Sequence, residues 1–488
     1  MPRSGVLALL VLVAASAVLL QPFGYNQGSH LALVHALADG TPRIDRYRDY
    51  SGDESFYRGH VYSNKAPGLA FATLPAYLAL RAAHLPHGVH VLSLWSVLLP
   101  AALLLLLVGS TVERIEPGLG TLTAATLGLA TLVLPFTGLF FAHVLSALLG
   151  FAAFAVLWRE RDGPPRLALL AAAGLLAGLA VTTEYPLALA GAVLGVYAIA
   201  RPQPVRRGLA YAAGVAVGVA PLLAYDWWAF GSPTHLSYGD ATGAHRGAGH
   251  PPGFFGVSAP RPRVALELLL SSRGLLVLGP VIALGAAGAV LLYRRGRRAE
   301  ASVVGSVAVA FVLYDSGFWG PFGGWGPGPR YLIPMLPFLA VPIALAWRRW
   351  PLTTGALAAV SAGIMLAATA TDPLIPDDPG RWWRLLVHGH FTRTIALGIA
   401  PFALLVAAAV LLVVRATPRL SLGRHDVAGA AAALAGWLVT LRAAPVLLRH
   451  GGLGAVGALL LALLAVAAVA AALAYVPVPR ARTSDVRS

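Results

Sequence analysis

The chain has no cysteine among its 488 residues, which excludes disulfides, thiol catalysis and thiolate metal sites and leaves the cellular compartment undetermined. Charged residues make up only 11% of it, against about 25% in soluble domains. Lysine is almost missing, because Lys65 is the one lysine among 36 lysine and arginine residues. No glycine-rich phosphate loop is present, so the sequence does not point to a nucleotide. This is not an ordinary soluble domain, and its single lysine calls for an explanation.

Hydrophobic residues are abundant instead, at 58%. Apolar runs recur from Leu7 to Tyr475, and many have about 20 residues, enough to cross a hydrocarbon core of about 30 Å. The run from Leu7 to Leu20 is interpreted as a first span that is retained. The pattern predicts an all-α polytopic membrane protein with about 13 transmembrane helices.

The net charge of +16 comes from arginine clusters that lie between apolar runs. This is the pattern of the positive-inside rule, so it marks the cytoplasmic side and gives no reason to expect a nucleic acid partner. It predicts a cytoplasmic C-terminus. Taking runs 67–84, 90–109 and 119–136 as full spans places loop 23–66 on the cytoplasmic side, whereas insertion of Leu7–Leu20 from a cytoplasmic Met1 places it outside. One of these segments must therefore be broken, re-entrant or wrongly paired.

The loop 23–66 concentrates acidic residues. It contains "SHLALVHALADG", which predicts a short helix lying on the membrane surface, and "RIDRYRDYSGDES", which spaces Asp45, Asp49 and Asp53 four residues apart. A carboxylate beside a cationic phosphate site can act as general base on an acceptor hydroxyl. The alternative is an ordinary solvated loop in which these residues form structural salt bridges with the intervening arginines.

Three cationic residues stand just before apolar spans: Lys65 in "SNKAPGLAF", Arg273 in "SSRGLL" and Arg330 in "GPFGGWGPGPRYLIPMLP". The glycines and prolines before Arg330 prevent a regular helix until Tyr331 and allow close approach of the backbone to a ligand. Together the three cations predict a phosphate clamp at helix N-termini. Further ionisable residues lie at span ends on the inferred outer side: Glu184 in "TTEYP", Asp226, Glu267 and Asp315. Together with these cations and the acidic loop, they indicate a polar cavity that opens outward. For each residue alone, an interfacial anchor is the competing interpretation.

The segment "YSNKAPG", after an acidic loop and a surface helix, resembles the GT-C membrane glycosyltransferases, in particular the protein mannosyltransferases and aminoarabinose transferases. The resemblance covers about residues 1 to 350. It implies a transferase that moves a sugar from a polyprenyl-phosphate carrier to an acceptor hydroxyl. It also implies a multi-pass enzyme of the bacterial cytoplasmic membrane whose site faces outside. The acceptor would be a cell-envelope glycan, a lipid or a protein.

The resemblance places Lys65 beside the lipid phosphate, where a compact charge on a flexible stem can follow a moving phosphate. Where the family usually has its catalytic aspartate, this sequence has Asn26 and Gln27, neither of which can be a general base. The base is therefore predicted to be Asp53, with Asp45 second and Asp49 after it. Lys65, Arg330 and Arg273 are predicted to bind the lipid phosphate. The predicted substrate cavity contains Tyr62, Asn64, Glu184, Asn26 and Tyr331.

No cofactor is implied, and Asn64, where some relatives have a metal-binding glutamate, argues against a metal there; a divalent cation elsewhere is left open. The predicted organisation is a catalytic module over residues 1–350 followed by additional helices over 351–488. Two other functions compete with transfer. A transporter or flippase for lipid-linked sugars would show inverted repeats and charges near span midpoints. A non-catalytic relative that only binds the lipid would tolerate loss of the loop aspartates.

Overall fold

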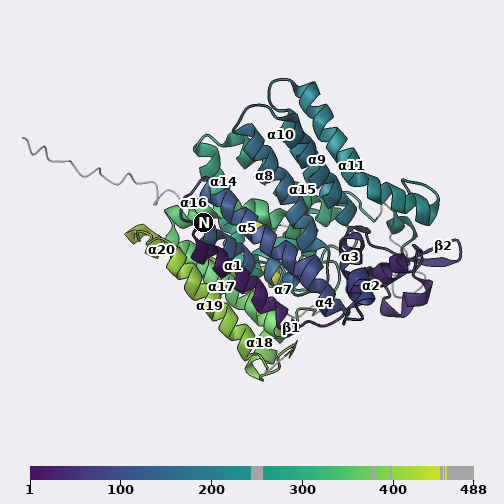
Figure 1. Cartoon of the computed structure of the whole chain (residues 1–488). Coiled ribbons are helices and arrows are strands. Elements are labelled where there is room, and N and C mark those ends of the chain that lie inside the picture. The colour runs from purple at the N-terminus through teal and green to yellow at the C-terminus, as the bar shows by residue number, and fades with distance from the viewer. Residues whose placement is uncertain (243–255, 375–379, 396–397, 451–453, 456, 459–488) are drawn as a thin grey trace, which may run out of the picture.

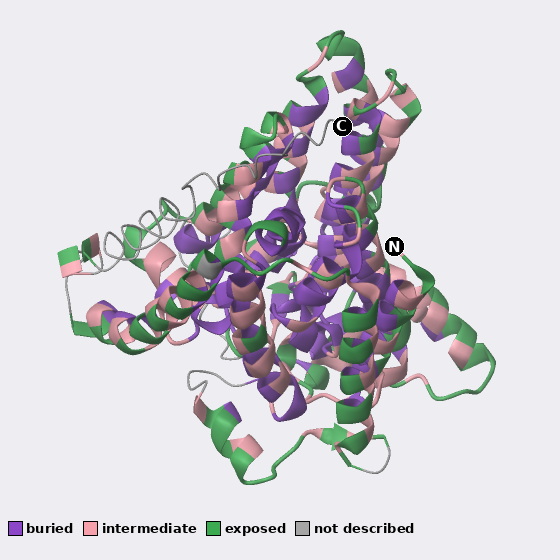
Figure 2. Ribbon diagram, turned by 90° about the vertical axis from the view of Figure 1, so that its left-hand side faces the viewer, coloured by how far each residue is buried: buried purple, intermediate pink, exposed green. Residues whose placement is uncertain are grey.

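The computed structural model describes residues 1–242, 256–374, 380–395, 398–450, 454–455 and 457–458. These residues form a bundle of helices with two small pairs of strands (Figure 1). Buried residues concentrate in the middle of the bundle, where the helices cross (Figure 2). The predicted all-α polytopic fold is confirmed.

Seven helical segments of the described part are long and apolar enough to cross a membrane. They are Val89–Glu113 (α4 Val89–Ser93, η2 Leu94–Leu98 and α5 Leu99–Glu113), α8 (His143–Arg161), α11 (Pro204–Phe230), α15 (Arg298–Gly317), Arg330–Arg349 (η5 Arg330–Met335 and α16 Leu336–Arg349), α17 (Pro351–Ala370) and α20 (Arg424–His450). Shorter apolar helices of 10–17 residues are α1 (Arg3–Ala17), α3 (Gly68–Ala82), α6 (Gly120–Leu129), α9 (Leu167–Thr183), α10 (Leu187–Ile199) and α19 (Ala400–Ala416). The count of about 13 transmembrane helices stays a prediction.

Two apolar runs are interrupted. The run 119–136 divides into α6 and a short α7 (Val133–Thr137), where Pro135 lacks the N–H that a continuous helix would use. The segment Pro262–Leu278 (α12 Pro262–Leu270 and α13 Leu275–Leu278) meets Pro280–Arg294 (η4 Pro280–Ile282 and α14 Ala283–Arg294) at a bend of 98°. The break between α6 and α7 falls in one of the N-terminal runs whose span count conflicted with an outside loop, and the topology of these runs stays a prediction.

Glycine sets the closest helix packing. Helices α9 and α11 lie side by side (Figure 1), and a Cβ on Gly174 would come within 2.0 Å of the Tyr211 carbonyl oxygen. A Cβ on Gly214 would come within 1.9 Å of the Ala171 carbonyl oxygen. Small residues let helix backbones approach where lipid surrounds the bundle, so these two helices depend on glycine for their contact.

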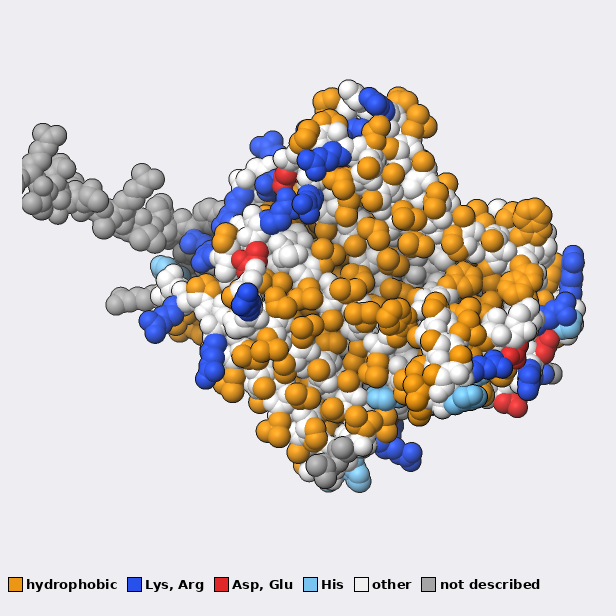
Figure 3. Space-filling model, in the orientation of Figure 1, with side chains coloured by type: hydrophobic (Ala, Val, Ile, Leu, Met, Phe, Trp, Pro, Cys, Tyr) orange, Lys and Arg blue, Asp and Glu red, His pale blue; other side chains and the backbone are white. Residues whose placement is uncertain are grey.

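Arginine side chains gather at one end of the bundle, which we call the arginine end; they lie beyond a broad hydrophobic surface (Figure 3). A buried ion pair joins Arg207 of α11 to Glu160 of α8 with 2.5 Å between Nη2 and Oε2. The Tyr197 hydroxyl donates to Glu300 at 2.7 Å, linking α10 to α15. Because neighbouring helices hold these charges in pairs, the pairs fix how the helices align at this end.

The loop end, on the far side of the hydrophobic surface, carries residues 23–66 (Figures 1 and 3). The predicted surface helix is α2 (Tyr25–Ala38), followed by the 3-10 helix η1 (Asp45–Tyr50). Strands β2 (Glu54–Tyr57) and β3 (His60–Ser63) then form an antiparallel hairpin. This end holds the residues that the sequence singled out.

The helices after residue 350 pack against the rest of the bundle. Strand β1 (Leu19–Leu20), which follows α1, pairs with β4 (Arg393–Thr394) near the short helix α18 (Gly380–Val387). The Asp426 carboxylate of α20 accepts backbone hydrogen bonds from Leu352 at 2.6 Å and Thr353 at 3.0 Å, at the start of α17. Residues 459–488 of the predicted C-terminal region lie outside the described residues.

Candidate active site

Helix α2 anchors the segment that carries Asp53. The Ser29 hydroxyl donates to the Asp53 carbonyl at 2.7 Å and lies 2.8 Å from the Ser63 hydroxyl. Helix α2 itself begins with a capping contact, because the Gly24 N–H donates to the Gln27 side chain at 2.7 Å. Gln27, at the place where the family has a carboxylate, therefore has a structural role.

Lys65 precedes α3, whose first residue, Gly68, packs directly on the end of α9. A Cβ on Gly68 would come within 2.6 Å of the Thr183 Cα. The Lys65 ammonium lies 2.9 Å from the Asp53 carboxylate, with the two side chains 13% and 30% exposed. Burial alone would raise the pKa of Asp53, but the Lys65 ammonium, with Arg330 and His30, brings this pKa below its usual value.

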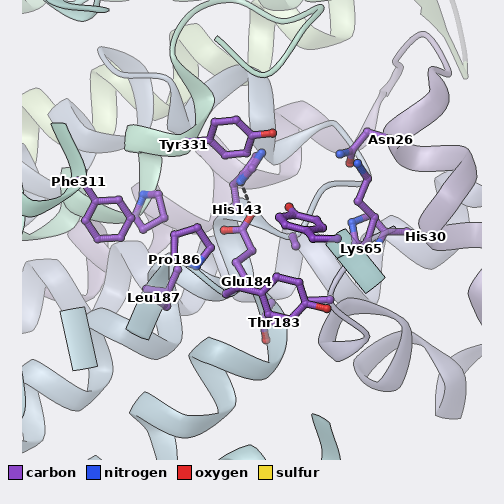
Figure 4. Close-up of a pocket in the computed structure, with 15 residues that line it drawn as sticks. Asn26, His30, Lys65, His143, Thr183, Glu184, Pro186, Leu187, Phe311 and Tyr331 are labelled. Atoms are coloured by element: carbon purple, nitrogen blue, oxygen red, sulfur yellow. Dashed lines mark ion pairs between the residues drawn. The ribbon is translucent and has the colours of Figure 1, made fainter. Parts of the chain in front are cut away.

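A small cavity of about 30 Å³ lies beside Lys65. The predicted cavity residues Asn26, Glu184 and Tyr331 line it, and Figure 4 shows their side chains around it. Its full lining is Asn26, His30, Lys65, Ala66, Ala142, His143, Thr183, Glu184, Tyr185, Pro186, Leu187, Tyr238, Phe311, Tyr331 and Pro334. The cavity is wide enough for a water molecule but not for a sugar, so a sugar-bearing ligand must widen it.

Arg330 is a buried guanidinium, 5% exposed, and its charge acts on Asp53. Its guanidinium carbon lies 5.1 Å from the centre of the Phe141 ring and 5.4 Å from that of Tyr331. Its Nε has no hydrogen-bond partner within the described part of the chain. A buried cation with an unpaired N–H is expected to bind an anion.

The backbone before Arg330 fits closely around it. Gly323 has φ of +69°, and a Cβ there would lie 2.4 Å from the Arg330 Nε. The sequence predicted a regular helix from Tyr331, but the chain forms the 3-10 helix η5 there, and α16 begins only at Leu336. The charge of Arg330, rather than the dipole of a long helix, is therefore the main attraction for an anion here.

Arg273 supports the same loop from outside. Its Nη2 donates to the carbonyl oxygens of Gly324 and Gly326 at 2.8 and 2.9 Å. Neither Arg273 nor Arg330 is among the residues that line the cavity, whereas Lys65 is. Of the three predicted phosphate-binding cations, Lys65 and Arg330 act directly on Asp53, while Arg273 holds the backbone that approaches Arg330. Phosphate contact by any of them stays a prediction.

Asp45 and Asp49 lie away from the cavity. Asp45 is 44% exposed, 2.9 Å from the His60 Nδ1, and it accepts the Val61 N–H at 2.7 Å. Asp49 is exposed on η1. The two carboxylates and Asp53 do not share a helical face, because the 3-10 helix ends at Tyr50. Of the three, only Asp53 is placed beside a predicted phosphate-binding residue.

Tyr62 and Asn64 are buried beside the cavity rather than in its lining. Tyr62 packs against Phe230, with 4.9 Å between ring centres. Asn64 is 8% exposed, and its Oδ1 has no partner in the described residues. Both side chains belong to the packing that carries Lys65.

The sequence analysis missed two histidines of the lining, His30 and His143. Burial, followed by the charges of Lys65 and His143, lowers the pKa of His30 well below its usual value of 6.5. His143 begins α8 and forms an ion pair with Glu184 (Figure 4). The sequence offered one signal for them, because each histidine directly precedes an apolar run. The pairing of His143 with Glu184 could be found only from the three-dimensional structure.

A second, apolar cavity of about 630 Å³ shares one lining residue, Thr183, with the first. Helices α3, α8, α9 and α11 surround it. Its lining comprises Gly68, Phe71, Ala72, Leu145, Leu149, Leu179, Thr182, Thr183, Pro221, Ala224, Tyr225 and Trp228. Trp228 is 52% exposed, so the cavity reaches the outer surface of the bundle.

Among the described residues no group of three or more His, Asp or Glu side chains could hold a metal ion, and metal independence stays a prediction.

No protein-family model and no curated protein sequence matches the chain. Among solved structures, it is similar to ArnT from Cupriavidus metallidurans in the apo state, with 17% identity, a TM-score of 0.49, and coverage of 95% of this chain and 74% of that one. ArnT bound to undecaprenyl phosphate gives 18% identity, the same TM-score, and coverage of 95% and 75%. The apo oligosaccharyltransferase of Archaeoglobus fulgidus gives 11% identity, a TM-score of 0.45, and coverage of 89% and 57%. Because these similarities are low, we base the function on residues of this chain.

Proposed function

We propose that this protein transfers a sugar from a polyprenyl-phosphate carrier to an acceptor hydroxyl of a cell-envelope glycan, lipid or protein. The reaction takes place at the loop end, on the outer face of the bacterial cytoplasmic membrane. The donor is a lipid with an anionic headgroup, so its site must combine an apolar cavity with cations in one continuous place.

Two unlike cavities that share the lining residue Thr183 carry this proposal. The small cavity is lined by Lys65, while the cavity of about 630 Å³ is lined almost entirely by apolar side chains, and Thr183 belongs to both. A polyprenyl chain in the apolar cavity would place its phosphate beside Lys65. The exposed Trp228 marks where the lipid would enter from the bilayer.

In the proposed reaction Lys65 and Arg330 neutralise the phosphate as it leaves the sugar. Fixed cations that meet developing charge in a site that excludes water provide the largest share of many rate enhancements. Asp53 holds Lys65 in place before the lipid arrives, and the ammonium then turns to the phosphate. The role of Asp53 as the base is the competing assignment for this carboxylate.

The test uses purified protein in lipid nanodiscs and radiolabelled polyprenyl-phosphate sugars, with release of free polyprenyl phosphate as the readout. Lys65→Ala and Arg330→Ala are each expected to lower kcat/KM by about 10²- to 10³-fold. Arg43→Ala, which removes an exposed cation of the same loop, is the control and is expected to leave turnover unchanged.

A second variant tests the apolar cavity. Ala224→Trp fills part of it and is expected to raise KM for long-chain donors while sparing a donor with one or two prenyl units. Equal effects on both donors would contradict binding of the lipid chain there. A wild-type protein that binds polyprenyl phosphate but does not turn over any sugar donor would refute the transferase and favour the non-catalytic or transport functions.

A further inference from the structure

His143 and Glu184 form a buried acid–base pair on one wall of the small cavity (Figure 4). The Nδ1 of His143 faces one carboxylate oxygen of Glu184. The other carboxylate oxygen accepts the Ser146 hydroxyl at 2.5 Å. His143 and Ser146 stand on the first turn of α8, and Glu184 ends α9, so contact between two helices fixes the carboxylate from both sides.

Aromatic rings hold the imidazole in one orientation. It stacks on Phe141 with 5.6 Å between ring centres and meets Phe136 and Tyr331 edge-on at 5.3 and 6.0 Å. His143 is only 3% exposed, and neither ring nitrogen has a hydrogen-bond partner among the residues that the structure describes; Nδ1 has the ion-pair contact with Glu184, whereas Nε2 has no such contact. A buried polar atom without a partner costs free energy, so its retention in this lining suggests a partner that arrives with the substrate.

We propose that His143, oriented by Glu184, accepts the proton of the acceptor hydroxyl. This assignment depends on the transferase function proposed above and identifies its base. With the proton of the neutral imidazole on Nδ1, beside the Glu184 carboxylate, the Nε2 lone pair lies on the side away from Glu184. The Glu184 carboxylate stabilises the imidazolium that forms when Nε2 takes a proton, as a carboxylate does for other catalytic histidines.

The step balances without another reactant. The hydroxyl proton passes to Nε2 of His143 as the acceptor oxygen forms its bond to the anomeric carbon of the sugar. The bond from that carbon to the phosphate oxygen breaks, and its electron pair stays on the phosphate, which Lys65 and Arg330 hold. Water then removes the proton from the imidazolium.

The other charged groups around the cavity make Asp53 a weaker base than this pair. Asp53 is occupied by Lys65 at 2.9 Å, and its pKa lies below its usual value after the opposing effect of burial is counted. The charges near His143 are Glu184, which pairs with it, and Lys65, which lines the same cavity. The Arg330 guanidinium lies over Phe141 and Tyr331, two rings that His143 also contacts. His30 lies between Lys65 and His143, because both act on its pKa.

The experiment measures kcat against pH in the nanodisc assay, together with polyprenyl phosphate affinity. His143→Gln is expected to lower kcat by about 10²- to 10⁴-fold and to leave affinity within about threefold. Glu184→Gln removes the charge that favours the imidazolium, so the acid limb of the profile is expected to move to lower pH. Added imidazole is expected to restore part of the turnover of His143→Ala.

The matched control is His235→Gln. His235 also pairs with a carboxylate, Asp240 at 2.5 Å, and stacks on Phe230, but it is not in the cavity lining. It is expected to keep the wild-type profile. Thermal unfolding of each variant separates loss of folding from loss of chemistry.

Two outcomes would overturn the assignment. Full turnover by His143→Gln with an unchanged acid limb would refute it and leave the transferase intact, and Asp53→Asn would then be expected to remove that limb. A wild-type protein without turnover on any donor would refute the transferase itself and the assignment with it.

Discussion

Two neighbouring glycines allow a direct test of whether Arg330 binds the lipid phosphate. Gly323 and Gly324 have φ of +69° and +81°, in the left-handed region. Alanine at either position costs about 1–2 kcal/mol for its backbone conformation. They differ in their surroundings, because a Cβ on Gly323 would lie 2.4 Å from the Arg330 Nε, whereas one on Gly324 has nothing within 4 Å.

Gly323→Ala must therefore displace the guanidinium, which has little room between the rings of Phe141 and Tyr331. A hydrogen bond to a charged group is worth about 1.5–3 kcal/mol. Loss of one such contact corresponds to a polyprenyl phosphate affinity about 10- to 100-fold weaker. Gly324→Ala has the same backbone cost as Gly323→Ala, so it is expected to lower the unfolding temperature too, but to leave the affinity for polyprenyl phosphate unchanged.

The assay is competition of labelled polyprenyl phosphate in nanodiscs, with thermal unfolding measured in parallel. In an Arg330→Ala background, Gly323→Ala is expected to cause no further loss of affinity, since the group that it displaces is gone. Equal affinities for the two glycine variants would refute the reasoning, because the position of the guanidinium would then not matter for the phosphate.

Three further predictions concern stability. The pKa of His30 in the folded protein lies below 6.5, so below pH 6.5 the unfolded chain binds a proton that the folded one does not. The free energy of unfolding is therefore expected to fall by up to about 1.4 kcal/mol per pH unit there, and His30→Gln should remove this part of the acid sensitivity in pH-dependent unfolding. Asp426→Asn weakens the cap on α17, where Asp426 is 4% exposed, and should cost about 1–3 kcal/mol in thermal unfolding, while Asp426→Glu should recover part. Arg207→Met leaves the Glu160 carboxylate, 1% exposed, without its ion-pair partner and should lower the free energy of unfolding by about 3–5 kcal/mol. Arg207→Met combined with Glu160→Leu should be close to neutral, and a double variant as unstable as the single one would contradict this.

Sequence patterns located most helices because length and apolar content are local properties. The breaks were harder to place. The run 119–136 looks continuous, yet α6 ends at Leu129 and α7 begins at Val133, since contacts with other helices decide where a Pro-containing run divides. The bend of 98° had a visible signal in Gly279–Pro280, but its angle comes from packing.

The site was predictable where charge stands out against an apolar sequence. Lys65 and Arg330 were singled out because each is a cation at a span boundary, and both act on Asp53 in the fold. His143 was missed, because a single histidine beside an apolar run usually belongs to the core. Its pairing with Glu184 joins positions 41 residues apart, and no local pattern records that contact.

The neutral residue at position 26 makes physical sense once the charges near the cavity are compared. Lys65 and Arg330 supply two positive charges, and the carboxylates of Asp53 and Glu184 balance them. A third carboxylate at position 26, where Asn26 shares the cavity lining with Lys65 and Glu184, would give the group a net negative charge and repel a phosphate. The His143–Glu184 pair supplies a base without a further carboxylate. A neutral residue at position 26 is therefore compatible with the proposed transfer, in which the proton goes to His143.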